Sequence, residues 1–205
     1  MPNLVSDLFN ENGIKSFSKA RWNEKIDSQN EGIYIISLSS DPNQNIGISV
    51  SPNFSDLQIQ QWINKVPNFL IDEKKPTLDL VKNRLLEFWL HDENILYIGK
   101  APRRSNNKGV GNRVSEYYRT ILGNGSPHSG GQWIKTLANL KDAYVYYGFT
   151  KNPTEIEFNM LTNFMSNVNE TTKEKLRDTD LPLPFANIRY KTGVDKNHGM
   201  KNQRL

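Results

Sequence analysis

The tripeptides Gly32-Ile33-Tyr34 and Tyr97-Ile98-Gly99 are separated by 62 residues in a chain of 205. Each belongs to a short run of β-branched and aromatic residues, which is typical of a strand. Alternation along the first run places Ile33 and Ile35 on the face opposite to Tyr34, so that they can be buried while the phenol faces a cleft. The ordinary alternative is that both tyrosines are half-buried strand aromatics.

Charge is unevenly distributed along the chain. The formal net charge is only +4, yet residues 99–119 hold six cations against one acid, and residues 189–205 hold five against one. The remainder is therefore mildly acidic. Basic segments on such a body are typical of a surface that binds a polyanion, although solvated loops rich in lysine would give the same pattern.

Composition excludes several classes of protein. The chain has no cysteine, which rules out a disulfide scaffold and a thiolate metal site and fits a reducing cytosol. It contains no run of about 20 apolar residues, and its N-terminus lacks a basic region followed by an apolar stretch. We therefore expect no membrane association, no secretory signal and a cytoplasmic location.

Periodicity and capping residues predict the remaining elements. Ser55 and Thr77 are suited to cap two helices, and Pro153 suits the first turn of a later one. One or two short helices are expected within residues 1–28, and residues 46–50 are a weak strand candidate. The expected helices cover residues 56–65, 78–89, 112–122, 132–140 and 154–168. The expected strands lie near residues 32–38, 94–99 and 143–148.

Further polar residues complete an ordered pattern. Arg113 and Tyr117 lie one turn apart in an expected helix, Glu157 follows an apolar residue in a later helix, and Asn187 closes a proline-rich stretch. In this order, and together with the two tripeptides, they resemble the GIY-YIG nuclease family over roughly residues 32–187. The resemblance implies an α/β fold whose small central sheet has three antiparallel strands flanked by helices.

The resemblance also implies a catalytic set and one metal ion. Tyr34 would be the general base toward water, and the cation of Lys100 would lower its phenol pKa from about 10. Arg113 would stabilise charge on the phosphate. Glu157, rather than Glu155, would hold Mg²⁺ or Mn²⁺ with substrate oxygens and waters. The implied catalytic residues are Tyr34, Tyr97, Lys100, Arg113, Tyr117, Glu157 and Asn187.

Each of these residues also has an ordinary explanation. Lys100 can be a solvated loop lysine, and Arg113 can lie on the solvated face of its helix. Glu157 can be a surface glutamate that the helix dipole favours. Asn187 can be a loop asparagine, and the long gap after Glu157 departs from the family pattern.

The expected nucleic-acid contacts come from the two basic segments and from a glycine-rich loop. Glycines at residues 130–131 precede an expected helix, and such a start can present backbone N–H groups to a phosphate. Two of the chain's histidines belong to these stretches, although a lone histidine is more often structural. The expected contacts are Arg103, Arg104, Lys108, Arg119, His128, Lys191, Lys196, His198 and Lys201.

The segment between the tripeptides departs most from the family pattern. Family members place a short hairpin there, whereas residues 39–93 form a large acidic insertion with two expected helices. The acidity argues against a phosphate-binding surface, so the insertion is expected to brace the core or form a subunit interface. The organisation is then a single nuclease domain over residues 1–205. Its appendages are an N-terminal helical extension (1–31), the insertion (39–93) and a basic C-terminal tail (189–205).

The resemblance and the compact length favour a metal-dependent, sequence-specific DNA endonuclease, most like a type II restriction enzyme of a bacterial cytosol. Double-stranded DNA is the expected partner. Cutting a palindrome needs two active sites, so a homodimer is expected, either preformed or assembled on DNA. Two alternatives stay open: an RNase or toxin of the same family, and a nucleic-acid-binding module without catalysis.

Overall fold

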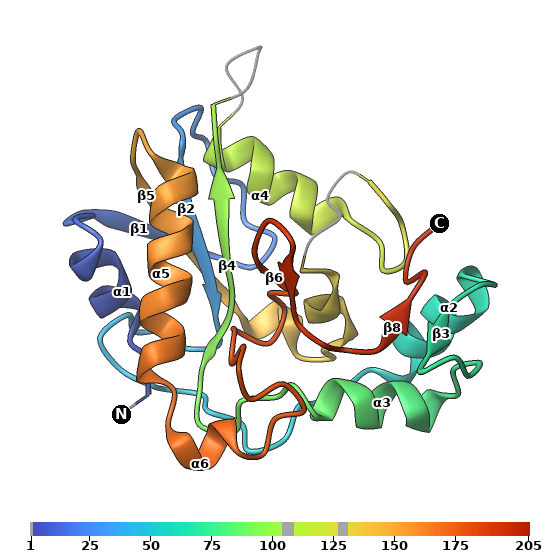
Figure 1. Cartoon of the computed structure of the whole chain (residues 1–205). Coiled ribbons are helices and arrows are strands. Elements are labelled where there is room, and N and C mark those ends of the chain that lie inside the picture. Colours follow the sequence, from blue (N-terminus) through green and yellow to red (C-terminus); the bar gives the residue numbers. More distant parts are fainter. Residues whose placement is uncertain (1, 104–108, 127–130) are drawn as a thin grey trace.

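A four-stranded antiparallel sheet forms the centre of the molecule (Figure 1). The computed structural model describes residues 2–103, 109–126 and 131–205. The strands lie in the order β1-β5-β2-β4, and each neighbouring pair is antiparallel. The sheet comprises β1 (Phe17–Arg21), β2 (Gly32–Ser37), β4 (Ile95–Ala101) and β5 (Tyr144–Phe149).

The α/β class and three of these strands agree with the sequence prediction, but the fourth strand is a correction. One or two short helices are predicted within residues 1–28, and α1 (Val5–Glu11) is such a helix, but no strand is predicted there, whereas Phe17–Arg21 is a strand at the sheet edge. Only Ala20 of this strand is buried. A strand that buries so little shows no clear alternation, and its conformation depends on its pairing with β5.

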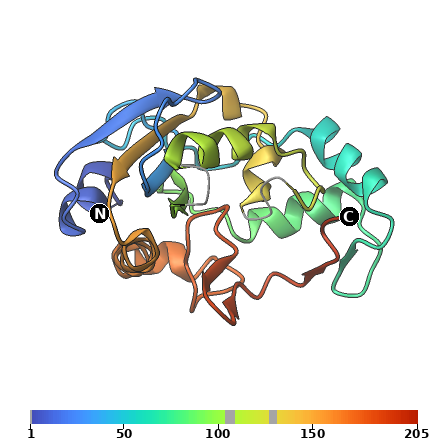
Figure 2. The ribbon, with the colours of Figure 1, turned by 90° about the horizontal axis from the view of Figure 1, so that it is seen from above.

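Two apolar layers cover opposite faces of the sheet, and alternation along β2 separates them. Ile33 and Ile35 pack in the layer that includes α1 and α5 (Pro153–Asn167). Tyr34 and Ile36 pack in the larger layer, which includes α4 (Val110–Arg119). Figures 1 and 2 show α5 along one side of the sheet and α4 on the other. The expected separation of Ile33 and Ile35 from Tyr34 is therefore confirmed.

The insertion begins its two helices at the predicted caps. In front of α2 (Asp56–Lys65), the hydroxyl of Ser55 accepts a hydrogen bond from the backbone N–H of Gln58, the third residue of the helix. Thr77 does the same for α3 (Leu78–Leu86). The second helix ends three residues earlier than predicted, with Glu87 at its C-cap.

The insertion forms one lobe with the end of the chain. The short strand β3 (Leu70–Ile71) pairs with β8 (Met200–Lys201). The indole N–H of Trp62 donates to the carbonyl of Gln203 at 2.7 Å, and that of Trp133 donates to the side chain of Gln203 at 2.9 Å. Both views place α2, α3 and the C-terminus together, away from α1 and β1 (Figures 1 and 2). The insertion therefore braces the C-terminal segment.

Several smaller elements differ from their predictions. Two short 3-10 helices lie within residues 132–142, where one helix is predicted over residues 132–140, and residues 46–50 form no strand. Among the described residues, no helix has the length and apolar content that crossing a bilayer requires. The remaining elements are η1 (Gln132–Thr136), η2 (Leu140–Asp142), α6 (Glu170–Lys173), β6 (Arg189–Lys191) and β7 (Val194–Asp195).

A buried carboxylate ties the start of the chain to the segment before β4. Glu93 is 2 % exposed and accepts hydrogen bonds from the backbone N–H of Asn3, at 3.1 and 3.2 Å, and from its side-chain amide, at 2.9 Å. Burial raises the pKa of Glu93 to about 7, against the opposing effect of these hydrogen bonds. The charged form is therefore less favourable in the folded protein than in the unfolded chain.

Glu93→Gln is expected to remove a pH-dependent part of the stability. Because the folded-state pKa is raised, the stabilising contribution of Glu93 is full below pH 4.5 and is lost as pH rises through about 7. The free energy of unfolding of wild type, minus that of the variant, should fall by about 1–3 kcal/mol between pH 4.5 and 8. Urea unfolding at several pH values measures this, and a flat difference would contradict it.

Candidate active site at the free edge of β4

β4 is the outermost strand of the sheet, and groups from distant segments form hydrogen bonds with the backbone N–H and C=O groups along its free edge. The side chain of Asn187 pairs with Ile98 as a neighbouring strand would, because its Oδ1 accepts from the Ile98 N–H and its Nδ2 donates to the Ile98 carbonyl, both at 2.8 Å. One residue earlier, the N–H of Ala186 donates to the carbonyl of Leu96 at 2.8 Å. Asn187 is only 5 % exposed, so it is a structural part of the sheet edge.

Glu157 occupies the next position along the same edge. It lies in the second turn of α5, and its Oε1 accepts from the backbone N–H of Lys100 at 3.2 Å. Its Oε2 forms a salt bridge with Nζ of Lys100 at 2.8 Å. The side chain of Glu157 is 19 % exposed and that of Lys100 is 36 % exposed. The carboxylate is thus fixed to the strand at one oxygen and can be reached from solvent.

Three tyrosines meet on the face of the sheet that carries α4. The ring centroids of Tyr34 and Tyr97 are 5.8 Å apart, and those of Tyr97 and Tyr117 are 5.2 Å apart. The hydroxyls of Tyr34 and Tyr97 share a hydrogen bond, and the hydroxyl of Tyr117 donates to the carbonyl of Gly131. Tyr34 and Tyr117 are fully buried, and Tyr97 is 7 % exposed.

Two glycines make this packing possible. A Cβ on Gly99 would lie 2.5 Å from a ring carbon of Tyr97 and 2.7 Å from Cζ of Tyr34, closer than real Cβ atoms approach. Gly131 has φ of 66° and would place a Cβ 2.5 Å from the hydroxyl of Tyr117. The Gly-Gly step was expected to present backbone N–H groups to a phosphate, and the structure adds a packing role for Gly131, which leaves room for Tyr117.

Burial dominates the acid–base behaviour of the tyrosines. It raises the pKa of all three phenols, and the neighbouring phenols raise them further. The charge of Glu157 adds to this for Tyr34 and Tyr97, while the cation of Arg113 acts in the opposite direction on all three. Arg113 and Glu157 therefore both lie within electrostatic reach of Tyr34 and Tyr97.

The expected effect of Lys100 on Tyr34 is wrong. Lys100 lies opposite Ile33 in the strand register, so alternation directs it to the face opposite to Tyr34. Its amine pairs with Glu157, and the phenol pKa is raised rather than lowered. Adjacency to the second tripeptide in sequence suggested proximity to Tyr34, whereas the sheet separates the two side chains. Arg113 is the cation that favours the phenolate.

Arg113 lies on α4 as predicted, one turn before Tyr117. Its guanidinium is 3.4 Å from Oε2 of Glu116, which lies three residues later on the same helix. The side chain of Arg113 is 24 % exposed and that of Glu116 is 13 % exposed. An arginine that is paired yet still reached by solvent can turn toward an incoming phosphate.

The predicted nucleic-acid contacts fall into several groups. Arg103, Arg119 and Lys191 are exposed, as such contacts must be. Lys201 is exposed but forms an ion pair with Glu73 of the insertion. The predictions for Arg104, Lys108 and His128 fall outside the described residues.

Lys196 and His198 are corrections, because both serve the interior of the protein. Lys196 is 4 % exposed and donates to the carbonyls of Pro184 and Phe185 at 2.9 and 3.2 Å, and burial lowers its pKa to about 7. Nδ1 of His198 accepts from the N–H of Met200 at 3.0 Å, and burial lowers its pKa to about 4. A buried amine and a neutral imidazole are unsuited to neutralise a phosphate.

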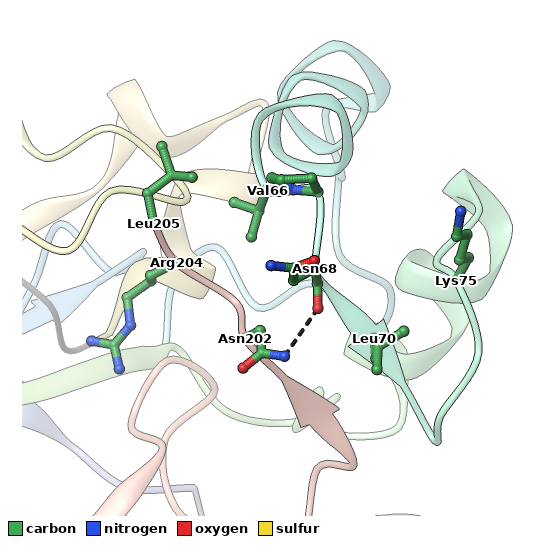
Figure 3. A pocket seen from close by; sticks show the side chains of 8 residues that line it. Val66, Asn68, Leu70, Lys75, Asn202, Arg204 and Leu205 are labelled. Carbon is green, nitrogen blue, oxygen red and sulfur yellow. Dashed lines mark hydrogen bonds between the residues drawn. The ribbon is translucent and has the colours of Figure 1, made fainter.

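The end of the C-terminal tail packs on the insertion lobe, whereas Lys191, near the start of the tail, lines the same hollow as Glu157. Its last residues enclose a hollow of about 530 Å³ against the segment between α2 and β3 (Figure 3). There the side chain of Asn202 donates to the carbonyl of Asn68 at 3.1 Å, and Arg204 and Leu205 lie along the rim. None of the predicted catalytic residues lines this hollow. The tail thus completes the insertion lobe.

A metal ion is implied only by the family resemblance, and the residues fit one kind of site. No cluster of three or more His, Cys, Asp or Glu suitable for a metal occurs in the described part of the chain. Glu157 offers one hard carboxylate at a solvent-accessible edge. Mg²⁺ accepts a single carboxylate when waters and substrate oxygens supply the other ligands. Such binding requires the amine of Lys100 to leave Oε2.

Comparison of the chain with protein-family models, with curated proteins and with solved structures finds no match.

Gly99→Ala is expected to disrupt the tyrosine packing without changing any polar group. The added methyl overlaps two rings, and overpacking of this kind costs about 1–3 kcal/mol of stability. Chemical denaturation and near-ultraviolet circular dichroism of the tyrosines measure it. Gly193→Ala is the control, because its Cβ meets nothing within 4 Å and only its φ of 78° is unfavourable. Equal, small losses in both variants would show that the rings adjust freely.

Lys196→Met is expected to lower stability by about 1–3 kcal/mol, since two buried carbonyls lose their donor. The salt dependence of nucleic-acid binding should stay unchanged, because the amine does not reach a phosphate. Lys191→Met, which removes an exposed cation, is the matched control and should leave stability nearly unchanged. A reduced salt slope in Lys196→Met alone would restore the original prediction for this residue.

Proposed function

We propose that the chain is a metal-dependent nuclease with a GIY-YIG-type core. One observation carries the proposal: Glu157 and Asn187, 30 residues apart in sequence, hold neighbouring positions on the strand that contains the second tripeptide. Glu157 and Arg113 also act electrostatically on Tyr34 and Tyr97. A structural role alone does not call for a carboxylate and a guanidinium that both act electrostatically on buried phenols.

The residues can divide the work of phosphodiester hydrolysis among themselves. Arg113 binds a non-bridging phosphate oxygen and stabilises the charge that develops there. Glu157 would hold the metal ion, which would supply Lewis-acid polarisation of the phosphate. Asn187 keeps β4 in place beside Glu157 through its two hydrogen bonds to Ile98.

The role of Tyr34 changes from that of a general base to that of a neutral hydrogen-bonding group. Its raised pKa leaves the phenol protonated near neutral pH. In the proposed mechanism its hydroxyl orients the attacking water or a phosphate oxygen, together with the hydroxyl of Tyr97. The water oxygen bonds to phosphorus as the bond from phosphorus to the leaving oxygen breaks, and the proton that the water loses passes through a non-bridging phosphate oxygen to the leaving oxygen, which departs as an alcohol.

Double-stranded DNA is the proposed substrate, and sequence-specific cleavage by a type II restriction enzyme acting as a dimer is the more specific form of the proposal. It is supported by the arrangement of residues 2–103, 109–126 and 131–205, in which the candidate site and the insertion lobe belong to one folded unit. Incubation of a defined plasmid with Mg²⁺ tests it. Discrete fragments support restriction, and a smear supports a nonspecific nuclease. Cleavage of RNA but not DNA would support the RNase alternative.

Glu157→Gln is expected to abolish Mg²⁺-dependent cleavage while leaving the fold intact. The amide keeps an oxygen for the Lys100 N–H but removes the charge that binds the metal. Glu155→Gln, on an exposed residue of the same helix, is the matched control and should cut normally. Cleavage is followed on plasmid DNA and stability by thermal unfolding. Normal cleavage by Glu157→Gln would sink the metal assignment.

Tyr34→Phe is expected to slow cleavage by about 10² or more, because the positioned hydroxyl is lost. Stability should fall by only about 1–2 kcal/mol, the loss of one hydrogen bond within retained packing. A neutral phenol does not titrate near pH 7, so the single-turnover pH profile of the variant should keep the wild-type shape. Loss of a rising limb in Tyr34→Phe would instead identify Tyr34 as the base.

A further inference from the structure

A groove that Glu157 lines extends well beyond the residues of the proposed mechanism. One hollow of about 690 Å³ lies between the end of β4, the start of α5 and β6. A second hollow, of about 510 Å³, shares Glu31, Arg103 and Lys151 with the first. We call the joined hollows the edge groove. The residues that characterise it are Lys100, Arg103, Phe149, Lys151, Phe158 and Lys191.

The edge groove holds the exposed aromatic side chains of the protein. The chain has four tryptophans, eight tyrosines and nine phenylalanines, all within the described residues. Of these, only Phe149 and Phe158 are exposed, at 46 % and 37 %. Both line the edge groove. The other aromatic side chains are buried or half-buried. The two exposed rings therefore share one groove beside the candidate active site, a placement that suggests a common role.

Exposed cations lie between and beside these rings. Arg103 and Lys151 line both hollows, and Lys191 lines the one that contains Phe158. Phe158 stacks on Tyr190 with ring centroids 5.0 Å apart, and Nζ of Lys191 lies 5.7 Å from the Tyr190 ring. The stack holds Phe158 in place from one side.

Three carboxylates also line the groove, and their negative charge opposes that of the cations. They are Glu31, Glu155 and Glu157. Glu31 accepts a hydrogen bond from the backbone N–H of Arg103 at 3.3 Å, and Glu157 is paired with Lys100. Both of these carboxylates therefore have partners within the protein, whereas the side chains of Lys151 and Lys191 extend into solvent.

We propose that the edge groove binds a single strand of nucleic acid with unpaired bases. Aromatic rings that alternate with cations suit such a strand, because bases stack on the rings while phosphates meet the cations. In a duplex the base faces are already stacked, so an exposed phenylalanine gains little from it. This inference rests on the proposed function only for the position of the cleaved phosphate, which lies at Glu157. A duplex substrate would then have to open, or carry a single-stranded tail, beside the cut.

Fluorescence anisotropy in EDTA tests the groove without cleavage. The probes are a labelled single strand of roughly 12 nucleotides, which is within the site size of a typical single-strand binder, and the blunt duplex of the same sequence. Phe149→Ala and Phe158→Ala should each weaken single-strand binding at least about fivefold, and duplex binding much less. Leu57→Ala removes a 66 % exposed side chain on α2 and should change neither.

Charge variants supply an independent measurement. Lys151→Gln should reduce the slope of log K against log[salt] for the single strand by about 0.7, the value for one lost phosphate contact. Lys141→Gln, an exposed lysine of η2 outside the groove, should leave the slope unchanged. Thermal unfolding confirms that each variant is folded.

The outcomes separate the groove from the nuclease. If both phenylalanine variants bind the single strand as wild type does, or lose duplex binding equally, the proposal is overturned even when the wild type cuts DNA. If the variants lose single-strand binding but the wild type cleaves neither DNA nor RNA with Mg²⁺, the groove is supported and the nuclease function is rejected.

Discussion

The organisation of the candidate site depends on the open edge of β4. A strand edge exposes unpaired N–H and C=O groups, and left bare it invites pairing with other chains. Here the backbone of Ala186 and the side chains of Asn187 and Glu157 satisfy that edge. The same contacts fix a carboxylate and an amide at defined positions relative to the sheet. The hydrogen bonds that satisfy the edge of β4 thus also position Glu157 and Asn187 in the candidate site.

Close packing on the opposite face imposes the second constraint. The tyrosines meet because Gly99 offers no side chain and Gly131 adopts a left-handed backbone conformation. Their burial keeps the phenols neutral, which favours hydrogen bonding over proton abstraction. The cation of Arg113 opposes this tendency without outweighing it. The electrostatic character of the site is therefore set by desolvation more than by any single charge.

Local signals in the sequence predicted much of the fold and failed where tertiary contacts decide. The caps at Ser55 and Thr77 and the alternation of β2 are local, and they were predicted correctly. The strand β1 depends on pairing with β5, and the burial of Lys196 depends on the loop it supports. The wrong prediction for Lys100 has a different origin. Lys100 directly follows Gly99, which lies opposite Tyr34, but adjacent residues of a strand point to opposite faces, so the Lys100 side chain points away from Tyr34. The edge groove could not be foreseen, because its rings and cations come from three separate segments.

The bracing of the insertion by residues 200–203 has a consequence for the order of folding. Gln203 accepts hydrogen bonds from Trp62 and Trp133, and β8 completes the pairing of β3. These partners lie 141 and 70 residues apart in sequence, and Asn187 reaches Ile98 across 89 residues. A growing chain from which residues 187–203 have not yet left the ribosome therefore leaves the edge of β4 and the insertion lobe incomplete. The proposed active site would then assemble only once those residues are free to fold back onto the earlier elements.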